Sequence, residues 1–235
     1  MRSALAIRET VEMTLPIARN IPEIDFNIGG LRSHAILSIF VAESGLSEAD
    51  RKIRGWLLHT VFSAARHYSR ARELVAQQND ADQQQDGGLV LHLLDVSENI
   101  EDCVTGVYRS CMAVRRMVDK SEPCREFVEA YSQEIDGLAK LRNQFEHMHG
   151  QIVSGETGSG PISMSLSDQG KAIGFRKLRF DIVSLYKLIR GLYQVVASMY
   201  PSFPINSIVS DRAWEPKKLT MSASATVIKK GEFDG

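Results

Sequence analysis

The chain has 235 residues and a net charge of −1, which excludes the clearly basic surface typical of a general nucleic-acid-binding domain. Hydrophobic residues make up 43% of the sequence and charged residues 24%, proportions typical of a soluble globular protein with a real core. The longest apolar run, from Ala35 to Ala42, is far shorter than the roughly 20 residues that a membrane-spanning helix needs, so no membrane segment is expected.

The N-terminal residues and the cysteines indicate a cytoplasmic protein. Arg2 and Glu9 interrupt the first residues, so the uncharged apolar stretch of a secretory signal peptide is missing. Cys103 and Cys111 lie on the same predicted helix, about 12 Å apart along its axis, which is too far for a disulfide. With Cys124 the cysteines are odd in number, and we expect all three as reduced thiols in the core.

Hydrophobic residues recur with the 3.6-residue period of a helix along most of the chain. Pro16 is expected to kink or end the first helix, Ser47 to cap the third, and Gly137 to break the fifth, leaving Leu138 to His149 as a separate helix. The predicted helices cover residues 2–20, 31–43, 48–77, 89–120, 122–149 and 181–200.

A β-hairpin is expected at about residues 161–180. Ile162, Met164 and Leu166 alternate with polar residues, and Asp168-Gln-Gly170 has turn composition. The sequence therefore predicts an all-α fold, a bundle of five or six helices with a small β-hairpin insertion, as one domain over residues 2–205. Residues 206–235 show no period and are expected to form a disordered tail.

One predicted helical stretch, residues 138–149, carries the densest group of acid–base side chains. On a helical wheel Arg142 and His149 lie at the edge of its apolar stripe, whereas Asn143 and His147 project from nearly the opposite side. The stripe itself fits within an arc of roughly 80°. Its members are Leu138, Leu141, Phe145, Met148 and Ile152.

Arg142-Asn-Gln-Phe-Glu-His147 has the form R-N-x-x-x-H and resembles the motif of the HEPN superfamily. Members are helical bundles with R-x(4–6)-H, commonly with a polar residue after the arginine; Arg142 to His149 fits the longer spacing. In active members the arginine and histidine of two protomers meet in a groove and cleave RNA without a metal. The resemblance implies a homodimeric endoribonuclease without a cofactor. Many members are not catalytic, so the alternative is an interaction or regulatory module.

The chemistry of the motif defines the expected roles. A neutral imidazole such as that of His147 can accept the 2′-hydroxyl proton of RNA. The guanidinium of Arg142 can stabilise charge on the phosphoryl oxygens, and the amide of Asn143 can orient either partner. Further contacts to substrate phosphates are expected from a second group of residues. That group is His149, Arg176, Lys177 and Arg179. The expected partners are RNA, a second copy of the chain, and an antitoxin or regulatory protein.

The sequence also allows other interpretations of these residues. Arg54 to His59 is a second R-x4-H pair, although glycine follows its arginine. Arg142 and Glu146, one turn apart, can form a structural ion pair with no catalytic role. A metal site is not expected, because histidines two residues apart on a helix point roughly 160° away from each other.

Two aromatic residues and one basic cluster are interpreted as parts of the fold and not of a site. Trp56 and Tyr108 fall near apolar stripes and are predicted core residues. A basic cluster on the fourth predicted helix is interpreted as its solvated side. The cluster comprises Arg109, Arg115, Arg116 and Lys120.

Overall fold

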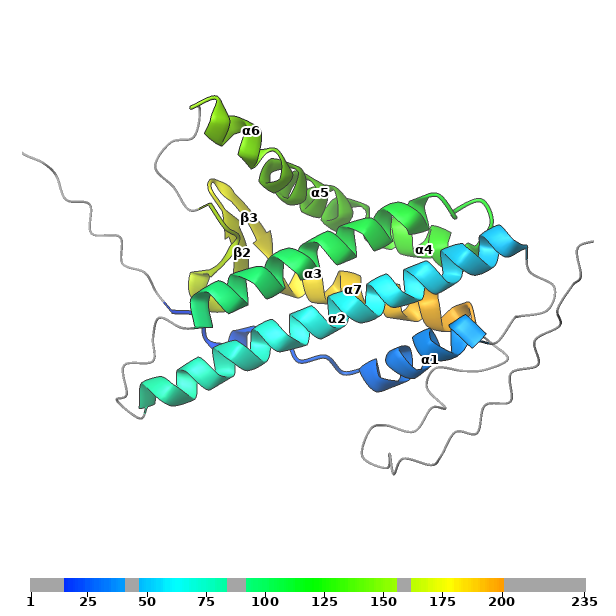
Figure 1. Ribbon diagram of the computed structural model, residues 1–235, viewed down its shortest axis with the longest axis horizontal. Coiled ribbons are helices and arrows are strands. Elements are labelled where there is room, and N and C mark those ends of the chain that lie inside the picture. The colour runs from blue at the N-terminus through cyan, green and yellow to red at the C-terminus, as the bar shows by residue number, and fades with distance from the viewer. Residues whose placement is uncertain (1–14, 41–46, 84–91, 156–161, 201–235) are drawn as a thin grey trace, which may run out of the picture.

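The computed structural model describes residues 15–40, 47–83, 92–155 and 162–200, excepting the side chains at 37–40, 81–83, 92 and 149. In this part the chain forms a helical bundle with a small antiparallel sheet, so the predicted all-α fold with a β insertion is confirmed (Figure 1). The helices are α1 (Ile28–Phe40), α2 (Glu48–Gln83), α3 (His92–Arg115), α4 (Glu122–Ala130), α5 (Ser132–Glu146), α6 (Met148–Val153) and α7 (Ile182–Ser198). The strands are β1 (Ser165–Ser167), β2 (Ala172–Phe175) and β3 (Leu178–Asp181).

The two longest helices, α2 and α3, run antiparallel side by side, with α7 behind them and α5 along the far side of α3 (Figure 1). Because their apolar residues follow the helical period, each presents a continuous buried stripe to its neighbours. The helical period predicted for residues 48–77 and 89–120 is thus confirmed over most of these two helices. Their buried members are Leu57, Val61, Ala64, Tyr68, Ala71, Val75, Val96, Ile100, Val104, Val107, Cys111 and Val114.

The starts of the helices follow from local capping. Ser47 Oγ accepts the Asp50 N–H at 3.1 Å and donates to the Asp50 carboxylate at 2.7 Å, so α2 begins as predicted, although it continues to Gln83. Helix α1 begins three residues before its predicted start, because Asn27 Oδ1 accepts the Gly30 N–H at 2.7 Å.

At the N-terminal edge of the described chain, the predicted helix over residues 2–20 is wrong for its C-terminal part. Only the short 3-10 helix η1 (Ala18–Asn20) forms there. The remainder, residues 1–14, lies outside the described residues.

The break near α5 differs from the predicted one. The chain breaks at Tyr131, between α4 and α5, whereas Gly137 lies inside α5. A Cβ at Gly137 would lie 3.3 Å from Phe180 Cε2, so glycine allows α5 to approach β3. At the other end α5 stops at Glu146, and His147 joins it to α6. Residues 138–149 therefore do not form a helix of their own.

The predicted hairpin is confirmed and carries a third strand. The order is β1-β2-β3, with antiparallel pairing throughout. Asp168, Gln169 and Gly170 form the first turn as the 3-10 helix η3 (Asp168–Gly170), all with positive φ. A Cβ at Gly170 would lie 3.3 Å from the Ile17 carbonyl oxygen, so the turn needs glycine. Asp181 then caps α7 by accepting the Ser184 N–H at 2.7 Å.

Among the described helices, none combines the length and apolar character that a bilayer crossing would demand. The expected tail, residues 206–235, and the outer ends of the predicted domain lie outside the described residues.

Candidate functional site

Helix α5 presents the R-N-x-x-x-H motif at the edge of the bundle. Leu138 and Leu141 are fully buried, and the Phe145 ring packs edge-on against Phe175 of β2, with ring centroids 5.4 Å apart. These contacts fix one face of α5 and leave Asn143 and His147 exposed, whereas Arg142 lies at the edge of the buried face. The predicted stripe stops short, however, because Ile152 on α6 is 46% exposed.

Arg142 is held by three groups. Its guanidinium lies 4.9 Å from the ring centroid of Tyr108 on α3, Nη2 lies 3.0 Å from Glu146 Oε1, and Nη1 donates to Asn143 Oδ1 at 3.3 Å. Within the described residues its buried Nε has no hydrogen-bond partner. The predicted pairing of Arg142 with Glu146 is thus confirmed, and the side chain keeps 22% of its surface exposed.

His147 lies at the junction of α5 and α6, and its side chain is exposed. Its N–H donates to the Asn143 carbonyl oxygen at 3.1 Å, which places the histidine one turn beyond that residue. In the described part of the chain its imidazole has no hydrogen bond or ion pair. Solvent and a ligand can therefore reach the ring. The side chain of His149 lies outside the described residues.

The basic residues of the β2–β3 turn divide into two groups. Arg176 donates to Gln151 Oε1 on α6, and Gln151 lies four residues after His147. The β2–β3 turn therefore lies against the end of the motif. Lys177 is exposed beside it. Arg179 instead donates to the Arg176 and Leu178 carbonyl oxygens, at 2.8 and 2.9 Å, and stabilises its own turn. Arg176 and Lys177 thus lie near α6, whereas the charge of Arg179 is already engaged by the backbone.

The second R-x4-H pair has a different setting. Arg54 Nη1 donates to the Met199 carbonyl oxygen at 2.9 Å and so joins α2 to the end of α7. His59 is exposed on α2. These contacts give Arg54 a structural role, and His59 offers a matched comparison for His147.

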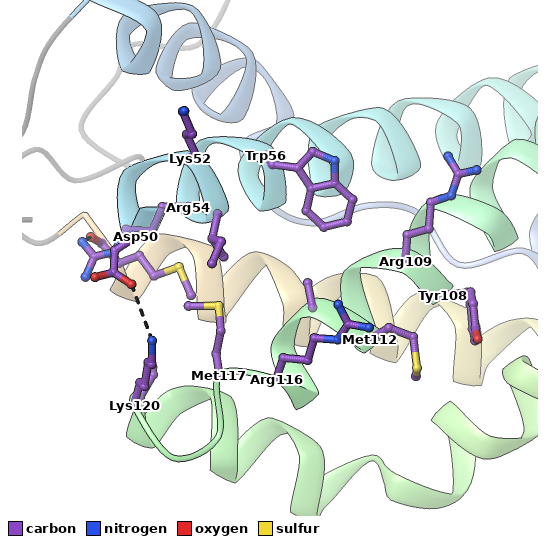
Figure 2. Close-up of a pocket in the computed structure, with 14 residues that line it drawn as sticks. Asp50, Lys52, Arg54, Trp56, Tyr108, Arg109, Met112, Arg116, Met117 and Lys120 are labelled. Carbon is purple, nitrogen blue, oxygen red and sulfur yellow. Dashed lines mark hydrogen bonds and ion pairs between the residues drawn. The ribbon is translucent and has the colours of Figure 1, made fainter. Parts of the chain in front are cut away.

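A cleft of about 810 Å³ lies between the N-terminal part of α2 and the C-terminal part of α3 with the turn after it (Figure 2). The prediction that Trp56 belongs to the core is wrong, because its side chain is 46% exposed in this cleft. Tyr108, which supports Arg142, also lines the cleft and is only partly buried. The helical period correctly places both rings beside the apolar stripes, but it does not show that the space between α2 and α3 is open to solvent here.

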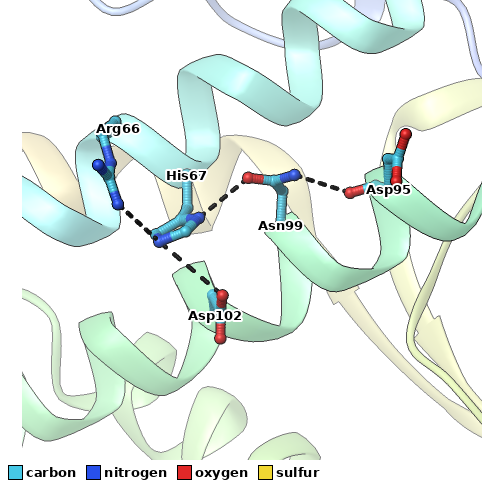
Figure 3. A network of polar contacts seen from close by, with 5 residues as sticks. All are labelled: Arg66, His67, Asp95, Asn99 and Asp102. Atoms are coloured by element: carbon cyan, nitrogen blue, oxygen red, sulfur yellow. Dashed lines mark hydrogen bonds and ion pairs between the residues drawn. The ribbon is translucent and has the colours of Figure 1, made fainter. Parts of the chain in front are cut away.

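A polar network at the α2–α3 boundary was also not predicted from the sequence (Figure 3). His67 Nδ1 lies 2.9 Å from Asn99 Oδ1, whose amide donates to the Asp95 carbonyl oxygen at 2.8 Å. His67 Nε2 lies 3.5 Å from Arg66 Nη2 and 3.8 Å from Asp102 Oδ2. These contacts tie α2 to α3, and a lone histidine on a helix gives no sequence signal for them.

The cysteines are free and buried, as predicted. Burial raises the pKa of Cys111 to about 12 and raises that of Cys103 and Cys124 as well. A thiol held protonated in the core is a poor nucleophile, so none of the three is a candidate catalytic group. Among the described residues, no three His, Cys, Asp or Glu side chains lie together as a metal site.

Neither a protein-family model nor a curated protein nor a solved structure matches the chain. Its function is therefore inferred from its own residues and their arrangement.

Proposed function

We propose that the chain is a HEPN-like endoribonuclease that cleaves single-stranded RNA as a homodimer and without a metal. The observation that carries the proposal is the accessible imidazole of His147, one turn after Asn143, on the same helix end as Arg142, whose guanidinium is supported by the Tyr108 ring. An accessible imidazole and a positioned cation are the two groups that metal-free phosphodiester cleavage needs.

In the proposed reaction, His147 takes the proton of the 2′-hydroxyl, whose oxygen attacks the adjacent phosphorus as the bond to the 5′-oxygen breaks. A 2′,3′-cyclic phosphate forms, and the leaving 5′-oxygen takes a proton from solvent. Arg142 stabilises the charge that develops on the phosphoryl oxygens, and Asn143 orients the guanidinium through their 3.3 Å contact. Arg176 and Lys177, on the turn beside α6, supply phosphate contacts. His149 belongs to the same proposed surface by its place on α6.

A second copy is the proposed partner at this end of the molecule. Ile152 and Val153 on α6 are 46% and 86% exposed, directly after the motif. Adjacent exposed apolar side chains are the kind of surface that a symmetric dimer covers. Light scattering of the purified chain tests this arrangement, with Val153→Glu expected to shift a dimer towards monomer.

One observation favours a second candidate, a non-catalytic interaction or regulatory module. The Glu146 carboxylate lies 3.0 Å from Arg142 Nη2 and competes with a phosphate for the guanidinium. In this second candidate the same surface binds a partner protein and no RNA is cleaved.

Cleavage of labelled single-stranded RNA in EDTA distinguishes the two candidates. His147→Ala is expected to lower the rate by about 10²- to 10⁴-fold, the contribution usual for a general acid–base group. His59→Ala is the matched control, because His59 is also exposed in an R-x4-H pair and is expected to have no effect. Absence of cleavage in the wild-type chain, or equal rates in both variants, would overturn the nuclease proposal.

A further inference from the structure

The cleft between α2 and α3 has an apolar lining that the fold leaves uncovered by any described element. Ile53 and Trp56 on α2 are 39% and 46% exposed. Trp56 lies opposite Met112 and Met117, which come from α3 and the turn after it (Figure 2). Methionine side chains adapt their shape to an apolar partner and are frequent at protein-binding surfaces. An exposed apolar surface of this kind marks a binding site.

The charged side chains around this cleft are almost all cationic. Among the described residues that line the cleft, Asp50 is the single carboxylate, and it lies 4.0 Å from Lys120. Arg109 and Arg116 form no ion pair with any residue in the described ranges, and both are exposed. The cationic members of the lining are Lys52, Arg54, Arg109, Arg116 and Lys120; of these, Lys52 pairs with Glu48 at 2.6 Å and Arg54 donates to the Met199 carbonyl oxygen, so Arg109 and Arg116 carry the charge argument. The cleft is therefore complementary to a ligand with an apolar face and negative edges.

The lining also has the dimensions of a helix-binding groove. Tyr108, Met112, Arg116 and Lys120 recur every four residues, so the cleft follows one side of α3 and continues along the turn after it. The helical part from Tyr108 to Arg115 alone spans about 10 Å, or roughly two turns. An amphipathic helix places its own i, i+3, i+4 and i+7 side chains over such a length.

We infer that this cleft binds an acidic amphipathic helix of a partner protein. Leucine-like side chains of that helix pack on Trp56 and the methionines, and carboxylates flanking them pair with Arg109 and Arg116. Single-stranded RNA is less suited, because base recognition uses successive aromatic faces and Trp56 is the only tryptophan in the described part of the lining. The second ring, Tyr108, already stacks on Arg142.

Fluorescence anisotropy with the full chain tests the inference. The probe is a labelled amphipathic peptide of about 16 residues, with leucines at helical spacing and glutamates on its flanks. The comparison peptide has lysine in place of each glutamate. We expect the acidic peptide alone to bind, and its affinity to fall with added salt. Arg109→Glu/Arg116→Glu and Trp56→Ala are each expected to weaken binding by about tenfold or more.

The matched control is Lys140→Glu/Lys187→Glu, which makes the same charge change at exposed positions outside the cleft and should leave binding intact. His147→Ala should also bind normally, which separates this inference from the proposed nuclease. Equal binding of the two peptides, binding retained in Arg109→Glu/Arg116→Glu, or no binding of the acidic peptide would overturn it. Displacement of the peptide by oligouridylate with the same dependence on Trp56 would assign the cleft to RNA instead.

Discussion

Substitution of Glu146 by glutamine tests the proposed role of Arg142. If Arg142 binds RNA phosphate, the substitution should tighten RNA binding, whereas a purely structural ion pair gives no such gain. The Glu146 carboxylate lies 3.0 Å from the guanidinium, and the two side chains are 41% and 22% exposed. A partly exposed pair of this kind contributes about 0.5–1 kcal/mol. An RNA phosphate must displace this carboxylate to reach Arg142. Glu146→Gln removes that competition and is expected to tighten RNA binding by roughly two- to fivefold.

The assay is fluorescence anisotropy of labelled single-stranded RNA in EDTA. The reference chain and the Glu146→Gln chain both carry His147→Ala so that the RNA stays intact. Glu73→Gln is the control, because Glu73 forms a comparable ion pair with Arg70 on α2 at 3.3 Å. Unchanged or weaker binding in Glu146→Gln would refute the reasoning, and so would an equal gain in both variants. The first result would leave the pair as a structural contact, and the second would reflect net charge alone.

Three further predictions concern stability and reactivity. Gly191→Ala should lower the free energy of unfolding by about 1–3 kcal/mol in denaturant titrations followed by circular dichroism, because the new Cβ would lie 2.8 Å from Phe127 Cε2. Gly150→Ala, with no atom within 4 Å of its Cβ, is the control and should not be destabilising. Burial raises the pKa of Glu101, so its ionisation opposes folding as the pH rises. Glu101→Gln keeps an acceptor for the Met164 N–H and should raise the melting temperature at neutral pH, with the gain disappearing in acid. The three buried thiols should resist Ellman's reagent in the native chain and react fully after unfolding; rapid native labelling would contradict their burial.

The core of the fold could be predicted because the spacing of apolar residues along the chain identifies the buried face of each helix. The stripes of α2 and α3 recur at helical spacing, and most residues that the pattern selects are buried, although Ile53 is 39% exposed. The break at Tyr131 could not be predicted in this way. It accompanies the packing of Phe127 and Tyr131 against Gly191, a residue some sixty positions away, and this contact is visible only in three dimensions.

The candidate site was predictable in part for the same reason. The pairing of Arg142 with Glu146 follows from their spacing of four on one helix. The contact of Arg142 with Tyr108 joins α5 to α3, and no spacing along the chain indicates it. The exposure of Trp56 likewise depends on which elements reach the first turns of α2. A periodic pattern identifies an apolar face but not the element that covers it.

The ring of Tyr108 belongs to two surfaces at once, since it lines the cleft and also supports the guanidinium of Arg142. Replacing it with alanine is therefore expected to impair both the proposed peptide binding and the proposed RNA cleavage, so this variant could not tell the two proposals apart. Trp56 and His147 each belong to one surface alone, so substitutions at these two positions separate the two proposed activities.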